Sequence, residues 1–296
     1  MAKQTVRLSA VQMCAMPDID ANLAQIAEQL TVLTSKDDSH AAASVTSNAE
    51  ADHIVLLPEC CLYFGGKEQD QLQLAHNAEQ QAKIFQGLAA LAERYQVYLL
   101  AGSLPTPAKT PDKFYNTSCL FSPQGELLGH YQKLHLFDVS VADNEKNYQE
   151  SRYTAAGEQT SCIALPFAQL GLSICYDVRF PELYRQLAGQ GADIITVPAA
   201  FTRVTGKAHW QTLLQARAIE NQVYIIAAGQ EGVHANGRET WGHSMIISPW
   251  GEILAEQEAG IGVISADFDP DLLAQVRNSI PVRQHNRFKT ELIHDE

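Results

Sequence analysis

The sequence predicts an α/β protein built as a four-layer α-β-β-α sandwich from two related halves. Short apolar runs alternate along the chain with segments of helical periodicity. The order of these elements in the first half returns in the second. With 296 residues, 46% of them hydrophobic, the chain is also long enough to bury a large core. Two β-rich halves with helices between their strands most simply pack sheet against sheet, with the helices outside.

The repeat rests on several matched segments. The turn S-P-Q-G-E at 122–126 returns as S-P-W-G-E at 248–252, with Pro and Gly at places that suit a type I turn. The other matches join 51–58 with 192–198, 95–101 with 221–227, and 8–11 with 172–175. Buried strands share Val, Ile and Leu by chance. The shared turn makes coincidence a weaker explanation than duplication.

The first half opens with a strand and a helix. Residues 6–13, V-R-L-S-A-V-Q-M, alternate as a strand does. After Pro17, residues 22–33 place Leu23, Ile26 and Leu30 on one helical face. Residues 35–50 are small and polar without any period, so we expect a surface loop there.

The remaining elements of this half follow in the same style. Apolar residues predict a buried strand over 54–57, ended by Pro58. The other predicted elements are a helix over 78–94, a strand over 97–101, and a hairpin of 115–121 with 126–131.

Cys175 lies at the junction of a strand and a helix in the second half. Residues 170–174 alternate like a half-buried strand, while Pro181 and Gly189 mark the two ends of a helix. A thiol that faces a helix N-terminus gains from the helix dipole, which favours the nucleophilic thiolate. A free cysteine is more often a small core residue. Other residues must therefore decide between the two roles.

Composition narrows the classes of partner. A formal net charge of −13 argues against nucleic acid or an anionic membrane surface. The start, M-A-K-Q-T-V-R, has no apolar leader and no run is long enough to span a bilayer, so we expect a cytoplasmic protein. Six cysteines without a C-x-x-C pair fit neither a disulfide scaffold nor a zinc site. We expect no metal.

Two charged residues join Cys175 as candidates for chemistry. Glu59 directly follows the buried run V-L-L-P, where a carboxylate is costly unless it is paired or functional. Lys133 ends the apolar strand around Y-Q-K-L-H-L-F. A structural ion pair and a surface lysine are the plainer readings of the two residues. Together, Glu, Lys and Cys at three strand ends form a set that acyl transfer could use.

These motifs resemble the three signatures of the nitrilase superfamily of carbon–nitrogen hydrolases. The matching stretches are L-P-E at 57–59, Y-Q-K-L-H-L-F-D at 131–138 and I-C-Y-D-V-R-F-P-E at 174–182, with further similarity at 206–221 and 241–252. The resemblance covers nearly the whole chain. It implies the four-layer sandwich over residues 1–268, catalysis without metal or cofactor, and a homodimer or larger homo-oligomer held partly by a C-terminal tail, residues 269–296.

The resemblance also implies catalytic roles. Cys175 would be the nucleophile, Glu59 the general base and Lys133 the cation facing the oxyanion, with the backbone N–H of Tyr176 as a second donor. Members of the family often carry a second glutamate, which best matches Glu150 in Y-Q-E-S. The spacing before it departs from the usual pattern, so Glu145 stays open as an alternative, as does a solvated loop acid.

Within the family, A-F-T-R-V-T-G-K-A-H-W at 200–210 looks closest to amidases acting on deaminated glutathione, with omega-amidases of 2-oxo-dicarboxylate amides next. These small amide substrates carry carboxylates. Arg179, Arg203 and Lys207 lie near the expected mouth of the site and are the candidate substrate-binding cations. Rim arginines without a role in binding are the plainer alternative.

Other classes of protein fit less well. A papain-like triad would need Cys175 with a histidine and an acid, and no motif places a histidine. Serine hydrolysis lacks the G-x-S-x-G elbow. A non-catalytic scaffold protein would not need to retain a buried set of Glu59, Lys133 and Cys175.

Overall fold

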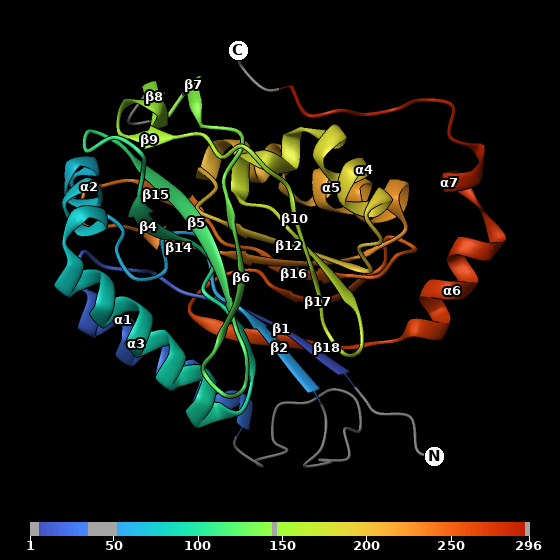
Figure 1. The fold of residues 1–296 in the computed structure, drawn as a ribbon, viewed down its shortest axis with the longest axis horizontal. Helices are drawn as coiled ribbons and strands as arrows, with labels where there is room; N and C mark the ends of the chain where they lie inside the picture. The colour runs from blue at the N-terminus through green and yellow to red at the C-terminus, as the bar shows by residue number, and fades with distance from the viewer. Residues whose placement is uncertain (1–5, 35–51, 144–146, 294–296) are drawn as a thin grey trace.

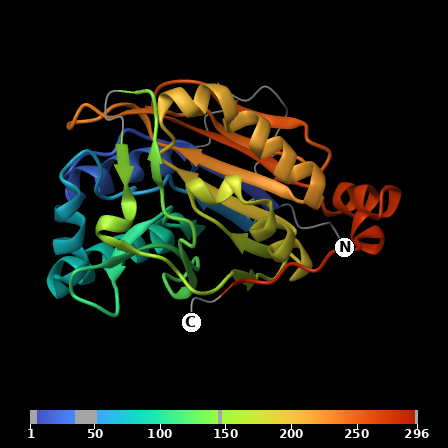
Figure 2. The ribbon, with the colours of Figure 1, turned by 90° about the horizontal axis from the view of Figure 1, so that it is seen from above.

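The computed structural model describes residues 6–34, 52–143 and 147–293, which form two large β-sheets between helices (Figure 1). The predicted surface loop over 35–50 and the alternative acid Glu145 lie outside the described residues. Figure 2 shows helices covering the outer faces of the paired sheets. The predicted four-layer α-β-β-α sandwich is confirmed.

The first sheet has the order β18-β1-β2-β3-β5-β4, with β6 and β9 also pairing with β5. β1 lies parallel to β2 and antiparallel to β18, so residues near the two ends of the chain meet in one sheet. The bounds are β1 Val6–Gln12, β2 Asp52–Leu56, β3 Tyr98–Leu100, β4 Leu104–Pro107, β5 Phe114–Phe121, β6 Leu127–Gln132, β9 Thr154–Ala155 and β18 Gly262–Phe268.

The second sheet has the matching order β10-β11-β12-β13-β16-β17. Its strands are β10 Ser161–Ala164, β11 Gln169–Leu172, β12 Ile194–Ala199, β13 Tyr224–Gly229, β16 Ser244–Ile247 and β17 Ile253–Gln257. Two small hairpins stand apart, β7 Asp138–Ser140 with β8 Asn147–Gln149, and β14 Glu231–Val233 with β15 Glu239–Trp241.

The helices cover the outer faces of the two sheets. α1 and α3 lie on the first sheet, and α4 and α5 lie on the second (Figure 1). The helical segments are α1 Ile19–Thr34, α2 Glu68–His76, α3 Ala78–Tyr95, α4 Pro181–Gly189, α5 Arg203–Asn221, α6 Pro270–Ser279 and α7 Val282–His285, with 3₁₀ helices at Glu150–Arg152 and Cys175–Arg179. None of the helices in the described ranges is both long and apolar enough to cross a membrane.

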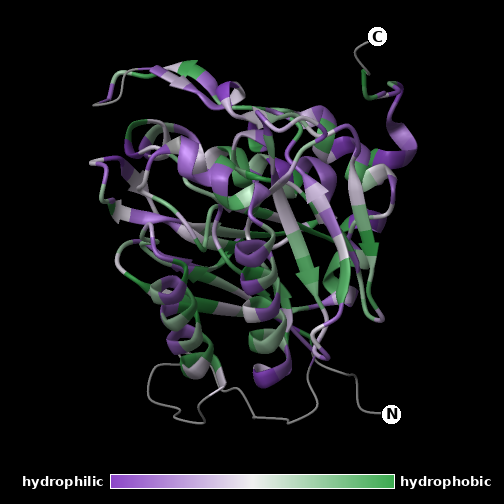
Figure 3. Cartoon of the chain, turned by 60° about the vertical axis from the view of Figure 1, so that its left-hand side comes forward, coloured by the Kyte–Doolittle hydropathy of each residue, from purple (hydrophilic) through white to green (hydrophobic). Residues whose placement is uncertain are grey.

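Alternation along the strands separates two layers of the core. In β2, Ile54 and Leu56 face the second sheet, while Val55 and the following Leu57 face α1 and α3. The apolar residues that the periodicity of α1 predicted, Ile26 and Leu30, are fully buried. In Figure 3, which colours each residue by its hydropathy, the hydrophobic residues accordingly concentrate on the strands and on one face of the helices.

Hydrogen bonding confirms the internal repeat at the two S-P-x-G-E turns. The N–H of Ser122 donates to the carbonyl of Glu126 at 2.8 Å, and the N–H of Ser248 donates to the carbonyl of Glu252 at 2.8 Å. In each turn the serine hydroxyl also accepts from the glutamate N–H, at 3.2 Å. The two halves are therefore alike in detailed turn geometry as well as in strand order.

Some boundaries differ from those the sequence predicts. α1 begins at Ile19, three residues early, because the Asp18 carboxylate accepts the N–H of Ala21 and caps the helix. α2 has no predicted counterpart, since its sequence E-Q-D-Q-L-Q-L-A-H is mostly polar. The strand before Cys175 ends at Leu172, two residues earlier than expected, whereas α4 begins at Pro181 as expected. Cys175 starts a separate 3₁₀ helix between them.

The C-terminal segment begins by packing on the body of the same chain. Leu273 and Val276 of α6 are buried, and Arg277 pairs with Asp193 at 2.7 Å. A role for residues 269–296 in oligomer contacts stays a prediction.

Candidate active site

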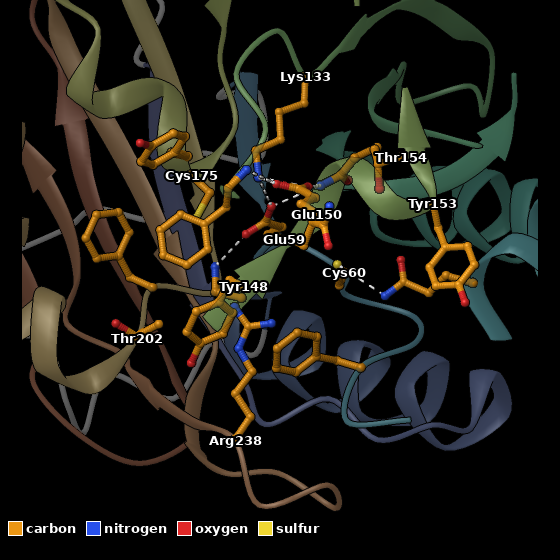
Figure 4. A pocket seen from close by; sticks show the side chains of 18 of the residues that line it. Glu59, Cys60, Lys133, Tyr148, Glu150, Tyr153, Thr154, Cys175, Thr202 and Arg238 are labelled. Carbon is orange, nitrogen blue, oxygen red and sulfur yellow. Dashed lines mark hydrogen bonds and ion pairs between the residues drawn. The ribbon is translucent and has the colours of Figure 1, made fainter. Parts of the chain in front are cut away.

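A cavity of about 810 Å³, including its open mouth, brings together the residues that the three motifs carry. Glu59, Lys133, Glu150 and Cys175 line it (Figure 4). Tyr176 lines it as well. The first three come from the first half of the fold and its connection to the second, and Cys175 comes from the second half. The cavity therefore depends on the pairing of the halves.

Glu59 receives hydrogen bonds on both carboxylate oxygens. The chain leaves β2 through Leu57 and Pro58, and Glu59 is only 5% exposed. Its Oε1 accepts from Lys133 Nζ at 2.9 Å and from Asn116 Nδ2 at 3.0 Å. Its Oε2 accepts the backbone N–H of Ala200 at 2.9 Å. The Cys175 thiol lies beside this carboxylate, near enough for each group to shift the pKa of the other.

Lys133 is shared between two glutamates. Its ammonium, on a side chain that is 1% exposed, donates to Glu59 Oε1 at 2.9 Å and to Glu150 Oε1 and Oε2 at 3.1 and 2.9 Å. Glu150 Oε2 also accepts the N–H of Phe137 at 2.7 Å. The structure thus places Glu150 in the buried charge cluster rather than on a solvated loop.

Cys175 occupies an unusual backbone conformation. Its φ of 50° lies in the left-handed region, which costs a non-glycine residue roughly 1–3 kcal/mol. This turn lifts the chain off β11 and directs the thiol toward Glu59. Cys60, next to Glu59, has a similar φ of 54°. The proposed nucleophile is thus itself strained, and a strained residue directly follows the proposed base.

Asp177 joins the 3₁₀ helix that begins at Cys175 to the segment around Lys133, residues 131–135. Fully buried, it accepts the Ile174 N–H at 2.8 Å and the Tyr131 hydroxyl at 2.8 Å on Oδ2. Its Oδ1 accepts from the backbone N–H of His135 at 3.1 Å and contacts the His135 ring Nδ1 at 2.7 Å. One carboxylate therefore joins residues on both sides of Lys133 to the loop that holds Cys175.

The charges of the cluster follow from burial and from its ion pairs. Burial alone would raise the pKa of Glu59, but the charge of Lys133 and hydrogen bonds from Cys175, Lys133 and Ala200 together lower it. Burial opposes the charge of Lys133, yet Glu150 and Glu59 raise its pKa well above the usual 10.5. At neutral pH, Glu59 is a carboxylate and Lys133 an ammonium.

The resting form of Cys175 differs from the sequence-based expectation of a thiolate. Burial and the neighbouring Glu59 raise the pKa of the thiol well above its usual 9.0, although Lys133 and the Ala200 N–H act in the opposite direction. The helix-dipole argument was wrong because α4 starts six residues later and burial outweighs the short 3₁₀ helix. The thiol rests protonated against a carboxylate that can accept its proton.

Tyr176 is the second residue of the 3₁₀ helix that Cys175 begins. At this position a backbone N–H has no acceptor within the helix, because the i−3 carbonyl precedes the first turn. This leaves the N–H of Tyr176 available for a ligand. The expected role as oxyanion donor stays a prediction.

The three predicted substrate-binding cations lie outside the cavity lining. Arg179 stacks over Phe201, with its Cζ 5.1 Å from the ring centroid. Arg203 Nε pairs with Glu239 at 3.1 Å and lines a neighbouring depression, and Lys207 is exposed on α5. Among the described residues, the cation that does line the cavity besides Lys133 is Arg238.

Sequence reasoning missed Asn116 and Arg238. Asn116 carried a usable signal, because it is a polar residue inside the fully buried strand F-Y-N-T-S-C-L-F. Arg238 carried none, since it follows a polar turn, H-A-N-G-R, and only the fold brings it to the cavity. In the described ranges, no group of three or more His, Cys, Asp and Glu side chains is arranged to hold a metal ion.

Comparison with known proteins places the chain among its relatives. The family model described as carbon-nitrogen hydrolase matches residues 7–278. The chain is 46% identical over 283 residues to a deaminated glutathione amidase of Synechocystis sp., covering 95% of this chain and 97% of that protein. It is 35% identical to the human omega-amidase NIT2, covering 90% of this chain and 94% of that protein.

A solved structure agrees with these relatives. The crystal structure of Saccharomyces cerevisiae Nit3, described as a member of branch 10 of the nitrilase superfamily, superposes with a TM-score of 0.80 at 29% identity. The match covers 97% of this chain and 98% of the yeast chain. Fold, family model and relatives agree over nearly the full length, and the chain belongs to the carbon–nitrogen hydrolase family.

Proposed function

We propose that this chain is an amidase that cleaves the C–N bond of a small carboxylate-bearing amide through a thioester on Cys175. The observation that carries the proposal is the buried contact of the Cys175 thiol with Glu59, whose carboxylate is also paired with Lys133. A nucleophile hydrogen-bonded to a base that a third group holds in place is the arrangement that covalent catalysis needs.

In the first half-reaction, sulfur attacks the amide carbonyl carbon while Glu59 accepts the thiol proton. Negative charge develops on the carbonyl oxygen, and Lys133 and the Tyr176 N–H stabilise it. One such donor contributes roughly 3–4 kcal/mol to the transition state. The C–N bond then breaks as Glu59 passes its proton to the leaving amine.

In the second half-reaction, water attacks the thioester carbonyl and Glu59 accepts the water proton. The C–S bond breaks, the acid is released and the thiol recovers its proton. Glu150 acts through Lys133, since both of its carboxylate oxygens accept from the ammonium. No cofactor takes part in these steps.

The preferred substrate that we propose is deaminated glutathione, cleaved to 2-oxoglutarate and Cys-Gly. Support comes from the relatives, among which a protein of that name is 46% identical over 95% of the chain. An omega-amidase acting on 2-oxo-dicarboxylate amides is the second candidate, because the human relative of that name spans 90% of the chain. We also propose a cytoplasmic homo-oligomer, following the pattern of the family.

The test compares kcat/KM for deaminated glutathione, 2-oxoglutaramate, a neutral aliphatic amide and a nitrile. We expect the two carboxylate-bearing amides to exceed the other compounds, with deaminated glutathione first. Preference for 2-oxoglutaramate would favour the omega-amidase. Turnover of none of the amides by folded protein would support a non-catalytic interaction protein instead.

A further inference from the structure

Arg238 lines two neighbouring hollows, the catalytic cavity and a second one that Arg203 and Glu239 also bound. Tyr148 is the other residue that both share. In Figure 4, Arg238 and Lys133 enter the cavity from opposite sides of the view. The guanidinium therefore lies across the catalytic cavity from the ammonium.

The Arg238 guanidinium lies over two aromatic rings. Its Cζ is 5.1 Å from the ring centroid of Phe64 and 4.9 Å from that of Tyr148. Aromatic contact uses the faces of a guanidinium and leaves the N–H groups of its edge free for hydrogen bonds. The rings thus fix the plane of the group without using its donors.

The Arg238 Nε is buried and has no hydrogen-bond partner in the described part of the chain. Buried donors are normally satisfied, because an unmet donor loses its hydration without compensation. Nε and a terminal nitrogen of arginine form the fork that binds a carboxylate through two parallel hydrogen bonds. A ligand carboxylate would supply the missing acceptor.

Two other cations near the site already have carboxylate partners. Lys133 directs its ammonium at three carboxylate oxygens, at 2.9, 2.9 and 3.1 Å. Arg203 pairs with Glu239 outside the cavity. Across residues 6–34, 52–143 and 147–293, no carboxylate is found in an ion pair with Arg238. Among the cavity-lining residues that the structure describes, Arg238 is thus the cation with an unmet buried donor.

The backbone holds Arg238 in a tight turn between β14 and β15. The N–H of His234 donates to the Arg238 carbonyl at 2.9 Å, and the Arg238 N–H donates to Asn236 Oδ1 at 3.1 Å. The buried ring of His234 also packs edge-on against Phe64, with centroids 4.4 Å apart. Arg238 and the Phe64 ring therefore belong to one connected unit, which reduces the conformational entropy lost on binding.

We propose that Arg238 is a specificity residue that binds a carboxylate of the substrate while the amide lies at Cys175. The inference deepens the proposed amidase function and rests on it. It assigns to Arg238 the recognition that the sequence alone suggested for Arg179, Arg203 and Lys207. Anion selectivity then comes from one guanidinium in the cavity, in a chain whose net charge of −13 offers an anion no long-range attraction.

The kinetic test uses Arg238→Gln and Arg238→Lys with two forms of one amide, the free carboxylate and its methyl ester. We expect Arg238→Gln to raise KM for the carboxylate form roughly 10-fold to 100-fold and to leave the ester unchanged. Arg238→Lys should recover part of the loss, because it keeps the charge without the planar fork. An unchanged carboxylate-to-ester ratio in Arg238→Gln would overturn the proposal.

Arg94→Ala is the matched control, since Arg94 also lies over a tyrosine ring, 5.3 Å from the centroid of Tyr95, at the exposed end of α3. Arg94→Ala should leave KM for the carboxylate form and for the ester unchanged. Arg203→Ala tests the alternative assignment directly. Selective loss of the carboxylate form in Arg203→Ala, and not in Arg238→Gln, would return the role to Arg203.

A binding measurement separates this inference from the amidase function. Calorimetry on the Cys175→Ala protein would use 2-oxoglutarate and Cys-Gly as separate probes. Arg238→Gln should abolish binding of the probe whose carboxylate Arg238 holds, which also identifies that end of the substrate. Equal binding with and without Arg238, or no binding of either probe, would contradict the proposal. Absence of amide turnover with Arg238-dependent binding would contradict the amidase function alone.

Discussion

At the scale of single residues, the site depends on Lys133, which forms ion pairs with both Glu59 and Glu150. Lys133 holds Glu59 in the charged form that can accept a proton from Cys175. In the proposed mechanism it would also lie beside the carbonyl that the thiol attacks. The same ammonium would then support the base before the reaction and the oxyanion during it.

Replacement of Lys133 by glutamine should separate these effects from binding. We expect Lys133→Gln to lower kcat roughly 100-fold to 1,000-fold with little change in KM, because the partner charge exists mainly in the transition state. Steady-state kinetics on protein with a native circular dichroism spectrum provides the measurement. A change confined to KM would assign Lys133 to substrate binding instead.

The sequence identified Glu59, Lys133 and Cys175 because each breaks a local pattern, as a charge after a buried strand or a thiol at an elbow. It could not identify Arg238, whose surroundings are polar along the chain and aromatic only in space. It misjudged the ionisation of Cys175, since a dipole argument from local sequence cannot include burial and a neighbouring carboxylate. The surroundings of Arg238 and the ionisation of Cys175 both depend on contacts between residues far apart in the sequence.

At the scale of elements, the 3₁₀ helix that starts at Cys175 is anchored by Asp177. The Tyr131 hydroxyl donates to Asp177 and accepts the N–H of Leu134 at 3.1 Å. Tyr131 is also buried, at 1% exposure. The Tyr131 phenol thus joins β6 to the segment that follows Lys133 and to the 3₁₀ helix that begins at Cys175.

Tyr131→Phe should lower the free energy of unfolding by about 1–3 kcal/mol, because it leaves a buried carboxylate oxygen and a partly buried N–H each short of one partner. Urea denaturation provides the measurement. Tyr63→Phe is the control, since that hydroxyl donates to Asp70 at 2.9 Å in a half-buried setting and should cost less. Equal losses in both variants would argue against a special role for the Asp177 junction.

Element boundaries were predictable where side chains near the boundary act locally. Pro181 marks the start of α4 as expected. The start of α1 was missed by three residues, although Asp18 is a recognisable cap. α2 was missed because its stability depends on packing against β4 and α3 rather than on its own periodicity.

At the scale of the whole molecule, the two halves meet at Glu59. The Ala200 N–H from the second half donates to its carboxylate, and Gln230 Nε2 donates to its carbonyl at 2.9 Å. Lys133 and Asn116 approach from the first half. The sequence repeat predicted the pairing of the sheets but not this junction, because its polar partners differ between the halves.

The stability of the fold should depend on pH through Glu59. Its lowered pKa means that the carboxylate stabilises the native state above its unfolded value of about 4.5, and that this stability is lost as the pH falls through the lowered value. The Lys133→Gln variant lacks the positive charge that lowers the pKa of Glu59, so burial raises this pKa. That variant then loses stability as the pH rises instead.

We therefore expect the difference in unfolding free energy between wild type and Lys133→Gln to grow above pH 4.5 and to reach roughly 3–5 kcal/mol at pH 7. Urea denaturation between pH 4 and pH 8 checks this. Lys109→Gln, which removes an exposed pair with Glu158, should show no such trend. A difference in unfolding free energy that stays constant with pH would mean that Lys133 does not control the pKa of Glu59.

The central claim is that Cys175 carries the acyl group, and rapid-quench mass spectrometry of the intact protein with an amide substrate tests it most directly. The account predicts a mass increase equal to the acyl group, located on the peptide that contains Cys175 and absent from Cys175→Ala, which should also lack turnover while keeping its fold. Turnover by Cys175→Ala near the wild-type rate, or an adduct on another residue, would contradict it.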